Sequence, residues 1–521
     1  MSPMFRFICF LSVSFLALPS SLMAADELRD EIDKLINHAD YRQGRWGILI
    51  VDDQGKTVYE RDADRLFLPA SVTKLYSCAA ALGILGKDYK FETPVYTRGT
   101  IKDGKLKGDL ILVGKGDLTF GGRTQKDGTV TFKNHDHIYA TGESSDYEIT
   151  ETDPLAGLKS LAKQIKDKGI KEIDGDVLID DRLFTHASGT GSGPATLTPI
   201  LVNDNVVDLV VTPAAEVGKP AGVRVVPENR FLQIDDQVET VVAGGKTKIE
   251  VESVGFNRLK VRGSIPIKSK PVLAIYAVED PASYARSLFI GCLRAAGIKV
   301  GASALEIAHG SLPEWEWYAK EKPLATCTSP PLSEAIKVTL KVSHNLYASL
   351  LPLLIAVKER KKTLAEGLKI QGEFLNKLGV DAKTISFAGG AGGANADAVT
   401  PRATVQLLRG MAAKHPEAYP AFVAAMPTLG VDGTLADVVA KNSPACGKVH
   451  AKTGTLMWDD LVNDRLLLKS KALAGIMTTA KGKCLTIALF VNDVPLPKGV
   501  KPDREGKKLG QLCEIIYKYA P

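Results

Sequence analysis

Paired cysteines, one-sided charge and long apolar runs are all scarce in this chain of 521 residues. Its seven cysteines form no CxxC motif, which removes support for a zinc site or a thioredoxin-type centre, and they are too few for a disulfide scaffold. The net charge of +6 is spread over interspersed acids and bases, so no basic stripe indicates nucleic-acid binding. No apolar run after residue 18 is long enough to span a bilayer. We therefore expect a soluble globular protein.

The N-terminus has the layout of a secretory signal peptide, which we assign to residues 1–25. Met1–Arg6 carries one positive charge and no acid, and residues 7–18 are apolar apart from two serines. Small residues follow, so we expect cleavage after Ala24 or Ala25 and export to the periplasm. An uncleaved membrane anchor is the weaker alternative. Six cysteines remain in the mature chain, which permits disulfides without fixing their pairing.

The length predicts two to four domains. A hairpin over Trp46–Tyr59 and a helix over Ser71–Leu85 open the mature chain, and short β-branched runs with two helical segments occupy Lys90–Gly310. Helices are then predicted at 331–357, 363–378, 400–413 and 506–519, with two adjacent strands at 471–479 and 483–491.

Three short motifs occur in order along the chain. They are Ser71-Val-Thr-Lys74, Ser343-His-Asn345, and Lys452-Thr-Gly454 followed by Thr455. Each motif alone is a weak signal. All three in this order, in an exported protein, are a strong combination that predicts a serine nucleophile.

The chemistry of the first two motifs is that of a nucleophile with its base. A serine at a helix start can present its Oγ in a cleft, and Lys74 lies three residues on, on the same helix face. Lys74 can accept the Ser71 proton if burial and cationic neighbours destabilise its ammonium. Ser343 is the expected proton relay to the leaving nitrogen, and Asn345 offers its carbonyl to Lys74 and its amide to substrate.

The third motif suits an anionic substrate end. Lys452 adds positive potential, and Thr453 and Thr455 offer hydroxyls to a carboxylate, with Gly454 between them in the predicted substrate-binding strand. The backbone N–H groups of Ser71 and Thr455 are the predicted oxyanion hole. This chemistry requires no metal and no cofactor.

The motif set resembles the penicillin-binding proteins and serine β-lactamases. More narrowly, it resembles the class C low-molecular-mass D-alanyl-D-alanine carboxypeptidase/endopeptidases, peptidase family S13. The first two motif serines stand 272 positions apart, from 71 to 343, which leaves room for the large insert of that family. Flanking phrases also match, at Leu68–Lys74, Gly114–Asp117, Asn203–Asp208, Ser329–Ser333, Val399–Pro401 and Gly430–Leu435.

The resemblance implies an α/β (α+β) fold: a serine β-lactamase/transpeptidase-like domain, with a five-stranded antiparallel sheet and a helical lobe, split by a large β-rich insert. Together with the predicted pattern of strands and helices, it implies these domain boundaries: the catalytic domain at 26–92 and 320–521, insert domain II at 93–190 and 270–319, and insert domain III at 191–269.

The implied function is cleavage of peptidoglycan stem peptides through an acyl-enzyme on Ser71, with β-lactam antibiotics as covalent inhibitors. Two alternatives stay open: a β-lactamase or esterase of the same fold, and a cell-wall-binding protein whose catalysis has decayed. The sequence does not fix the preference for carboxypeptidase or endopeptidase substrates, or the oligomeric state.

The chain also departs from the family pattern. His344 stands where the family usually has an acid, and Ala391–Ala394 replaces a Ser-Gly-Leu-Ser phrase with Asn395 in place of an arginine. The segment after Thr455 is longer than usual, and we expect Trp458 over the site mouth.

Three other features receive ordinary structural interpretations. We interpret His135–His137 as solvated loop residues, Asp180 and Asp181 as turn residues, and Cys78 as a buried core thiol.

Overall fold

The structure is a computed structural model that describes residues 20–191, 193–229, 232–255 and 257–520. Most of the predicted signal peptide, residues 1–19, therefore lies outside the described residues, and the described chain begins with α1 (Ser20–Ile36). No helix in the described ranges combines the length and apolarity needed to cross a membrane. The cysteines in these ranges are all free thiols: Cys78, Cys292, Cys327, Cys446, Cys484 and Cys513.

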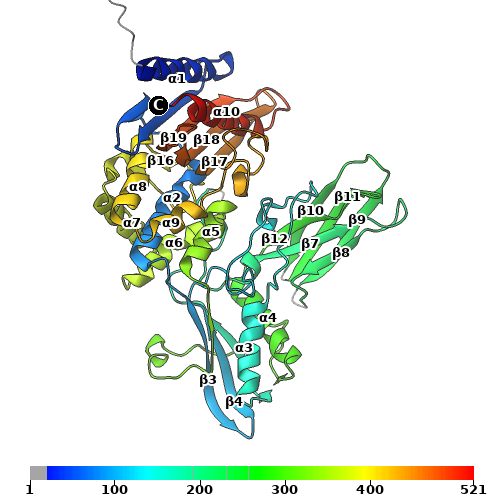
Figure 1. Cartoon of the computed structure of the whole chain (residues 1–521). Helices are drawn as coiled ribbons and strands as arrows, with labels where there is room; N and C mark the ends of the chain where they lie inside the picture. Colours follow the sequence, from blue (N-terminus) through cyan, green and yellow to red (C-terminus); the bar gives the residue numbers. More distant parts are fainter. Residues whose placement is uncertain (1–19, 192, 230–231, 256, 521) are drawn as a thin grey trace, which may run out of the picture.

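A five-stranded antiparallel sheet lies at the centre of the upper part of the molecule (Figure 1). Its order is β17-β18-β19-β1-β2, with bounds β1 (Arg45–Asp52), β2 (Thr57–Arg61), β17 (Val449–Asp460), β18 (Arg465–Thr478) and β19 (Cys484–Pro495). The predicted hairpin at 46–59 is confirmed as β1 and β2. The two predicted strands at 471–479 and 483–491 are confirmed as β18 and β19.

Both faces of this sheet are buried, because its inner strands are apolar at successive positions. In β1, Ile48 and Ile50 pack with α1 and with α10 (Asp503–Tyr519), while Leu49 and Val51 pack with the helical lobe. Figure 1 shows α1 and α10 together on one side of the sheet.

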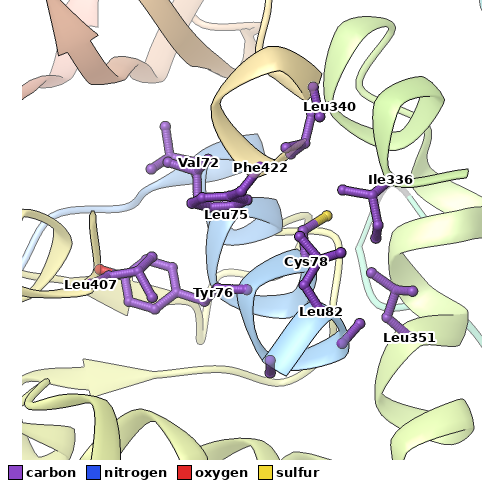
Figure 2. Packing of buried hydrophobic residues seen from close by; sticks show 14 of the residues in the cluster. Val72, Leu75, Tyr76, Cys78, Leu82, Ile336, Leu340, Leu351, Leu407 and Phe422 are labelled. Carbon is purple, nitrogen blue, oxygen red and sulfur yellow. The ribbon is translucent and has the colours of Figure 1, made fainter. Parts of the chain in front are cut away.

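The helical lobe covers the other face of the sheet. It consists of α2 (Thr73–Leu85), α5 (Leu332–Lys341), α6 (Asn345–Lys358), α7 (Leu364–Leu378), α8 (Pro401–Lys414) and α9 (Tyr419–Ala425). Helix α2 runs through the middle of this lobe, and its first ten residues are all buried. Figure 2 shows Leu75, Cys78 and Leu82 surrounded by Ile336, Leu351 and other side chains of the lobe. An Ala- and Leu-rich helix without a polar face is suited to this central position.

The predicted helix at 331–357 is interrupted in the structure, and this interruption shapes the site. The chain leaves α5 at Val342 and enters α6 at Asn345, and Ser343 adopts a left-handed backbone with φ of 65°. A residue with positive φ cannot continue a right-handed helix, so Ser343 is turned out of the helical path. His344 then caps α6 by accepting a hydrogen bond at Nδ1 from the Tyr347 N–H.

The insert, which we define as residues 93–319, contributes most of three further sheets. A six-stranded sheet holds β3 (Glu92–Lys102), β4 (Lys105–Val113), β5 (Glu172–Ile173), β6 (Val177–Asp180), β13 (Lys299–Val300) and β14 (Ala325–Thr328). The helices α3 (Ala156–Asp167) and α4 (Pro281–Ala295) pack with its apolar side chains. Strand β14 lies outside the insert and pairs with β3.

Two three-stranded sheets complete the insert. One has the order β12-β7-β8, with β7 (Val206–Thr212), β8 (Gly222–Val226) and β12 (Val272–Ala277), and the other has β10-β11-β9, with β9 (Gln233–Val241), β10 (Lys248–Gly255) and β11 (Arg258–Pro266). In Figure 1 these strands lie to the right of the helical lobe and above α3 and α4. A two-stranded ladder of β15 (Ile385–Ser386) and β16 (Ala398–Val399) belongs to the helical lobe.

Candidate active site

A cleft of about 810 Å³ opens where the sheet, the helical lobe and the insert meet. The predicted site residues in its lining are Ser71, Ser343, Asn345, Thr453 and Thr455. Lys74 and Lys452 are fully buried beside it. The structure therefore brings residues from three distant segments of the chain to one place.

Lys74 makes three hydrogen bonds of equal length. Its Nζ donates to Ser71 Oγ, to Asn345 Oδ1 and to the Ala391 carbonyl oxygen, each at 2.8 Å. Burial lowers the pKa of Lys74 to about 7, against small opposing effects of Cys78 and Asp397. Near neutral pH much of this amine is uncharged, so its lone pair can accept a proton along the contact with Ser71.

Ser71 stands in a short 3₁₀ turn, Ala70–Val72, immediately before α2. Two glycines let other segments close on this turn. A Cβ on Gly392 would lie 1.9 Å from the Ala70 oxygen, and one on Gly454 would lie 2.4 Å from the Pro69 oxygen and 3.2 Å from the Ser71 nitrogen. The third motif therefore needs glycine at 454 because strand β17 passes directly against the nucleophile turn.

Lys452 and Ser343 form a second pair. Lys452 Nζ donates to Ser343 Oγ at 2.9 Å and to the Thr453 carbonyl at 2.8 Å. Burial, reinforced by the charge of Lys74, lowers the pKa of Lys452 well below its ordinary value. The insert supports this pair from the other side, because the Tyr139 hydroxyl donates to the Ser343 carbonyl at 2.5 Å.

The hydroxyls of the third motif have different partners. Thr453 Oγ1 donates to Thr434 Oγ1 at 2.7 Å, and Thr455 Oγ1 accepts from Lys471 Nζ at 2.9 Å. Sequence reasoning missed both Thr434 and Lys471. The register of the β17–β18 hairpin, which pairs Thr455 with Lys471, is the signal that would have found Lys471.

The loop at Ala391–Ala394, which departs from the family pattern, still contacts the site. Ala391 supplies the carbonyl that Lys74 uses. Asp397, fully buried, holds the loop by accepting from the backbone N–H groups of Ala388 at 2.8 Å and Ala394 at 3.0 Å. A backbone contact of this kind does not depend on the side chains of Ala391–Ala394, which explains why the altered residues leave it in place.

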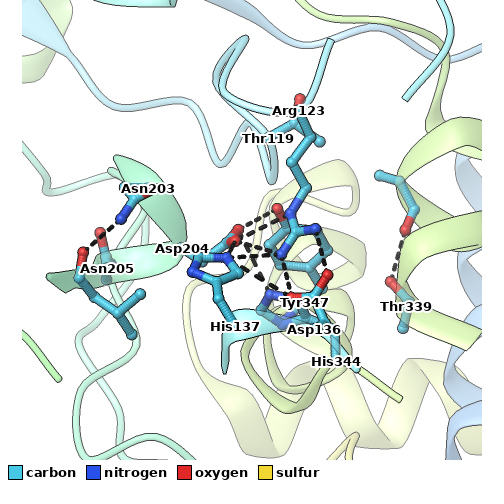
Figure 3. A network of polar contacts seen from close by, with 12 residues as sticks. Thr119, Arg123, Asp136, His137, Asn203, Asp204, Asn205, Thr339, His344 and Tyr347 are labelled. Atoms are coloured by element: carbon cyan, nitrogen blue, oxygen red, sulfur yellow. Dashed lines mark hydrogen bonds and ion pairs between the residues drawn. The ribbon is translucent and has the colours of Figure 1, made fainter. Parts of the chain in front are cut away.

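A buried ionic network lies behind the second motif (Figure 3). Arg123 donates to both oxygens of Asp136, at 2.8 and 2.7 Å, and to Asp204 Oδ2 at 3.0 and 2.7 Å. His137 lies 2.7 Å from Asp208 and 3.0 Å from Asp204. The solvated-loop interpretation is wrong for Asp136 and His137, which are 1% and 3% exposed, because these groups pair with one another inside the protein.

His344 joins this network from the catalytic side. Its ring stacks on Tyr347 with centroids 3.7 Å apart, and the Tyr347 hydroxyl donates to Asp204. Burial lowers the pKa of His344, so it is a neutral member of the network. A neutral side chain is compatible with this place because Arg123 is already balanced by two carboxylates.

The remaining predictions have mixed outcomes. Cys78 is a buried thiol, as predicted. Asp180 is not a turn residue: it is fully buried at the end of β6 and accepts hydrogen bonds from Arg182 and Tyr318. Trp458 lies in β17, about half exposed beneath Lys469, and is not among the described residues that line the cleft.

Comparison with known structures places the fold. The crystal structure of penicillin-binding protein 4 (DacB) from Haemophilus influenzae matches with a TM-score of 0.68 at 21% identity, over 94% of this chain and 99% of that one. A structure of the same protein complexed with a novel β-lactam matches with a TM-score of 0.67 at 22% identity, over the same shares. These two matches show that the chain shares the fold of that penicillin-binding protein.

Comparison with known sequences places the family. The D-Ala-D-Ala carboxypeptidase 3 (S13) family matches residues 28–508. A D-alanyl-D-alanine carboxypeptidase of Actinomadura sp. is 30% identical over 454 residues, 82% of this chain and 76% of that protein. The carboxypeptidase DacB of Haemophilus influenzae is 25% identical over 459 residues, 84% and 83% of the two chains. The chain belongs to the D-Ala-D-Ala carboxypeptidase 3 (S13) family, as its motifs predicted.

Proposed function

We propose that this chain is an exported serine DD-peptidase that cleaves D-Ala-D-Ala or D-Ala-diamino acid bonds of peptidoglycan stem peptides. The observation that carries the proposal is the pairing of Lys74 with Ser71 at 2.8 Å beside the pairing of Lys452 with Ser343 at 2.9 Å, at one cleft. A nucleophile with its own buried amine base, next to a second hydroxyl and a second amine, suits acyl transfer.

The proposed reaction has two halves. Ser71 Oγ attacks the D-Ala carbonyl while Lys74 takes its proton, and the backbone N–H groups of Ser71 and Thr455 stabilise the oxyanion. Ser343 passes a proton to the leaving nitrogen, so D-alanine or the amine of a cross-linked peptide departs. Water then attacks the acyl-enzyme, and the proton flow reverses.

The substrate-side roles follow from charge. Lys452, Thr453 and Thr455 hold the carboxylate of the leaving residue, and Asn345 binds both Lys74 and the peptide backbone. The relatives named as D-alanyl-D-alanine carboxypeptidases support this substrate class. The β-lactam complex of the Haemophilus influenzae protein supports β-lactams as inhibitors that acylate Ser71.

The proposed location is the periplasm. It rests on the N-terminal charged, apolar and small-residue pattern, with removal of residues 1–25. N-terminal sequencing of the protein recovered from a Gram-negative secretion host tests it: a mature chain beginning at Ala25 or Asp26 supports export with cleavage.

Mass spectrometry tests the reaction directly. Incubation with a fluorescent penicillin gives a covalent adduct on the peptide containing Ser71, and a D-Ala-D-Ala peptide releases D-alanine. Ser71→Ala abolishes both results, whereas Ser160→Ala, which changes a serine on α3 of the insert, leaves both intact.

Two other outcomes would replace the proposal. Rapid release of hydrolysed β-lactam, with little peptide cleavage, identifies a β-lactamase or esterase. Peptidoglycan binding with an unreactive Ser71 identifies a cell-wall-binding protein without catalysis.

A further inference from the structure

We propose that Lys471 is a specificity-determining residue that makes the cleft select substrates whose leaving residue carries a free α-carboxylate. This inference rests on the proposed function and adds a residue outside all three motifs. It names the chemistry that Lys471 recognises, a carboxylate on the residue after the scissile bond, and the chemistry that it rejects, a neutral amide at the same place.

The position of Lys471 supports this role. Strand β18 places it opposite Thr455, the last residue of the third motif. Its side chain lines the cleft although the residue is only 9% exposed. Gly506 of α10 lies beside the ammonium group, since a Cβ built on Gly506 would be in ordinary contact with Lys471 Nζ at 3.5 Å.

The hydrogen bond from Lys471 to Thr455 determines where the Thr455 hydroxyl can donate its own proton. Lys471 Nζ donates to Thr455 Oγ1 at 2.9 Å, which occupies an acceptor site of the hydroxyl. The Thr455 proton therefore points elsewhere, and Thr455 lines the cleft. A hydroxyl held in this way is a ready donor to a carboxylate oxygen.

Charge gives the second reason. Lys452 is fully buried and already donates to Ser343 and to a backbone carbonyl, so two of its N–H donors are used within the protein. Lys471 lines the same cleft; burial lowers the pKa of its ammonium, and the nearby carboxylates of Asp503 and Glu505 act against that effect and favour the charged form. A substrate carboxylate beside Thr455 thus meets a second cation, whereas an amide gains no charge interaction from it.

The role of Lys471 applies to both kinds of substrate, terminal peptides and cross-links. In a terminal D-Ala-D-Ala peptide the recognised group is the C-terminal carboxylate. In a cross-link it is the carboxylate on the amino-bearing carbon of the diamino acid that leaves. Amidation of either carboxylate removes the group that Lys471 recognises.

Two matched substrates test the inference: an acyl-D-Ala-D-Ala peptide with a free carboxylate and the same peptide as its C-terminal amide. We expect Lys471→Met to lower kcat/KM for the acid by roughly 10- to 100-fold, the usual effect of losing a charge-assisted hydrogen bond, and to change kcat/KM for the amide little. Lys471→Gln, which keeps a hydrogen-bond donor without the charge, lowers the acid-to-amide ratio as well. Lys471→Arg, which keeps the charge, retains most of the wild-type acid-to-amide ratio of kcat/KM.

Lys469→Met is the control, since it removes the same charge from the same strand at a residue outside the described cleft lining. It leaves the ratio unchanged. An equal loss on both substrates, or an unchanged ratio in both neutral variants, overturns the inference while the proposed function stands. A wild-type protein that cleaves neither peptide overturns the proposed function itself, and the inference with it.

Discussion

At the scale of single residues, burial determines whether Lys74 is an acid or a base. A lysine in water is almost fully protonated at neutral pH, and a protonated amine cannot accept the proton of Ser71. The pKa of Lys74 is lowered to about 7 chiefly because the group is buried, and the like charge of Lys74 also lowers the pKa of Lys452. The charge on Lys74 therefore disfavours the charged form of Lys452, and the two amines titrate as a coupled pair.

This electrostatic arrangement predicts the pH dependence of acylation. Lys74 must be neutral to act, so the rate of Ser71 acylation by penicillin should rise as pH increases from about 5.5, by up to about tenfold per unit, and level off above about 7. Stopped-flow measurement of the second-order rate between pH 5 and 9 checks this.

Lys74→Arg is the control for that profile. The guanidinium keeps the charge but does not deprotonate in this range, so acylation should be slower by about 100-fold or more and should lack the rising limb. A flat profile in the wild-type protein would contradict the role given to Lys74.

At the scale of secondary-structure elements, close backbone approach fixes the nucleophile turn. The loop around Gly392 and the strand around Gly454 both press on residues 69–71, and in both places a side chain would collide with backbone. Gly392 also has φ of 86°, a conformation that L-residues rarely adopt.

Gly392→Ala tests this packing. The added Cβ would meet the Ala70 oxygen at 1.9 Å, so we expect a loss of about 1–3 kcal/mol in the free energy of unfolding and at least tenfold slower penicillin acylation. Gly372→Ala in α7 is the matched control, because nothing lies near its added Cβ. It should be neutral or stabilise the protein by up to about 1 kcal/mol, as measured by urea unfolding.

Sequence reasoning found elements whose pattern is local and missed geometry that depends on distant contacts. The β1–β2 hairpin has turn residues between apolar runs, so its position could be predicted. The break between α5 and α6 could not, since apolar residues continue on both sides and the left-handed Ser343 is supported by Tyr139 from the insert.

The residues of the candidate site also fall into two groups, those that sequence motifs predict and those that only the structure identifies. The three motifs name their own residues, and the structure brings Ser71, Lys74, Ser343, Asn345 and Lys452 together. Lys471 carries no motif and is found only when the strand register is known. The sequence around His137 looks like a polar loop, because its partners Asp204 and Asp208 lie about 70 residues away.

At the scale of the whole molecule, the insert contacts the helical lobe directly behind Ser343, the proposed proton relay. Its Arg123, Asp136 and Asp204 form the buried network that contacts His344 and Tyr347 at the start of α6. We propose two modules within the insert: domain II at 93–190 and 270–319, which holds α3 and α4, and domain III at 191–269, to which β12 is joined by its pairing with β7. The network lies where the insert meets the second motif, so it can couple the insert to the position of Ser343.

Asp204→Asn tests that coupling. The variant keeps the shape of the side chain but removes a charge that balances Arg123, so we expect about 3–5 kcal/mol of lost stability, the usual cost of breaking a buried ion pair. If the network also positions the second motif, acylation of Ser71 slows even at temperatures where the variant is fully folded. Hydrogen exchange then increases in the 342–347 segment.

The control is Asp167→Asn, which removes one partner of an exposed ion pair with Lys163 on α3 and should change stability by less than about 0.5 kcal/mol. Asp204→Asn with reduced stability but normal acylation and normal exchange at 342–347 would limit the network to holding the insert together. Slower acylation in the folded variant would instead mean that the insert takes part in catalysis through Ser343, because Asp204 touches Tyr347 and His344 but does not line the cleft within the described residues.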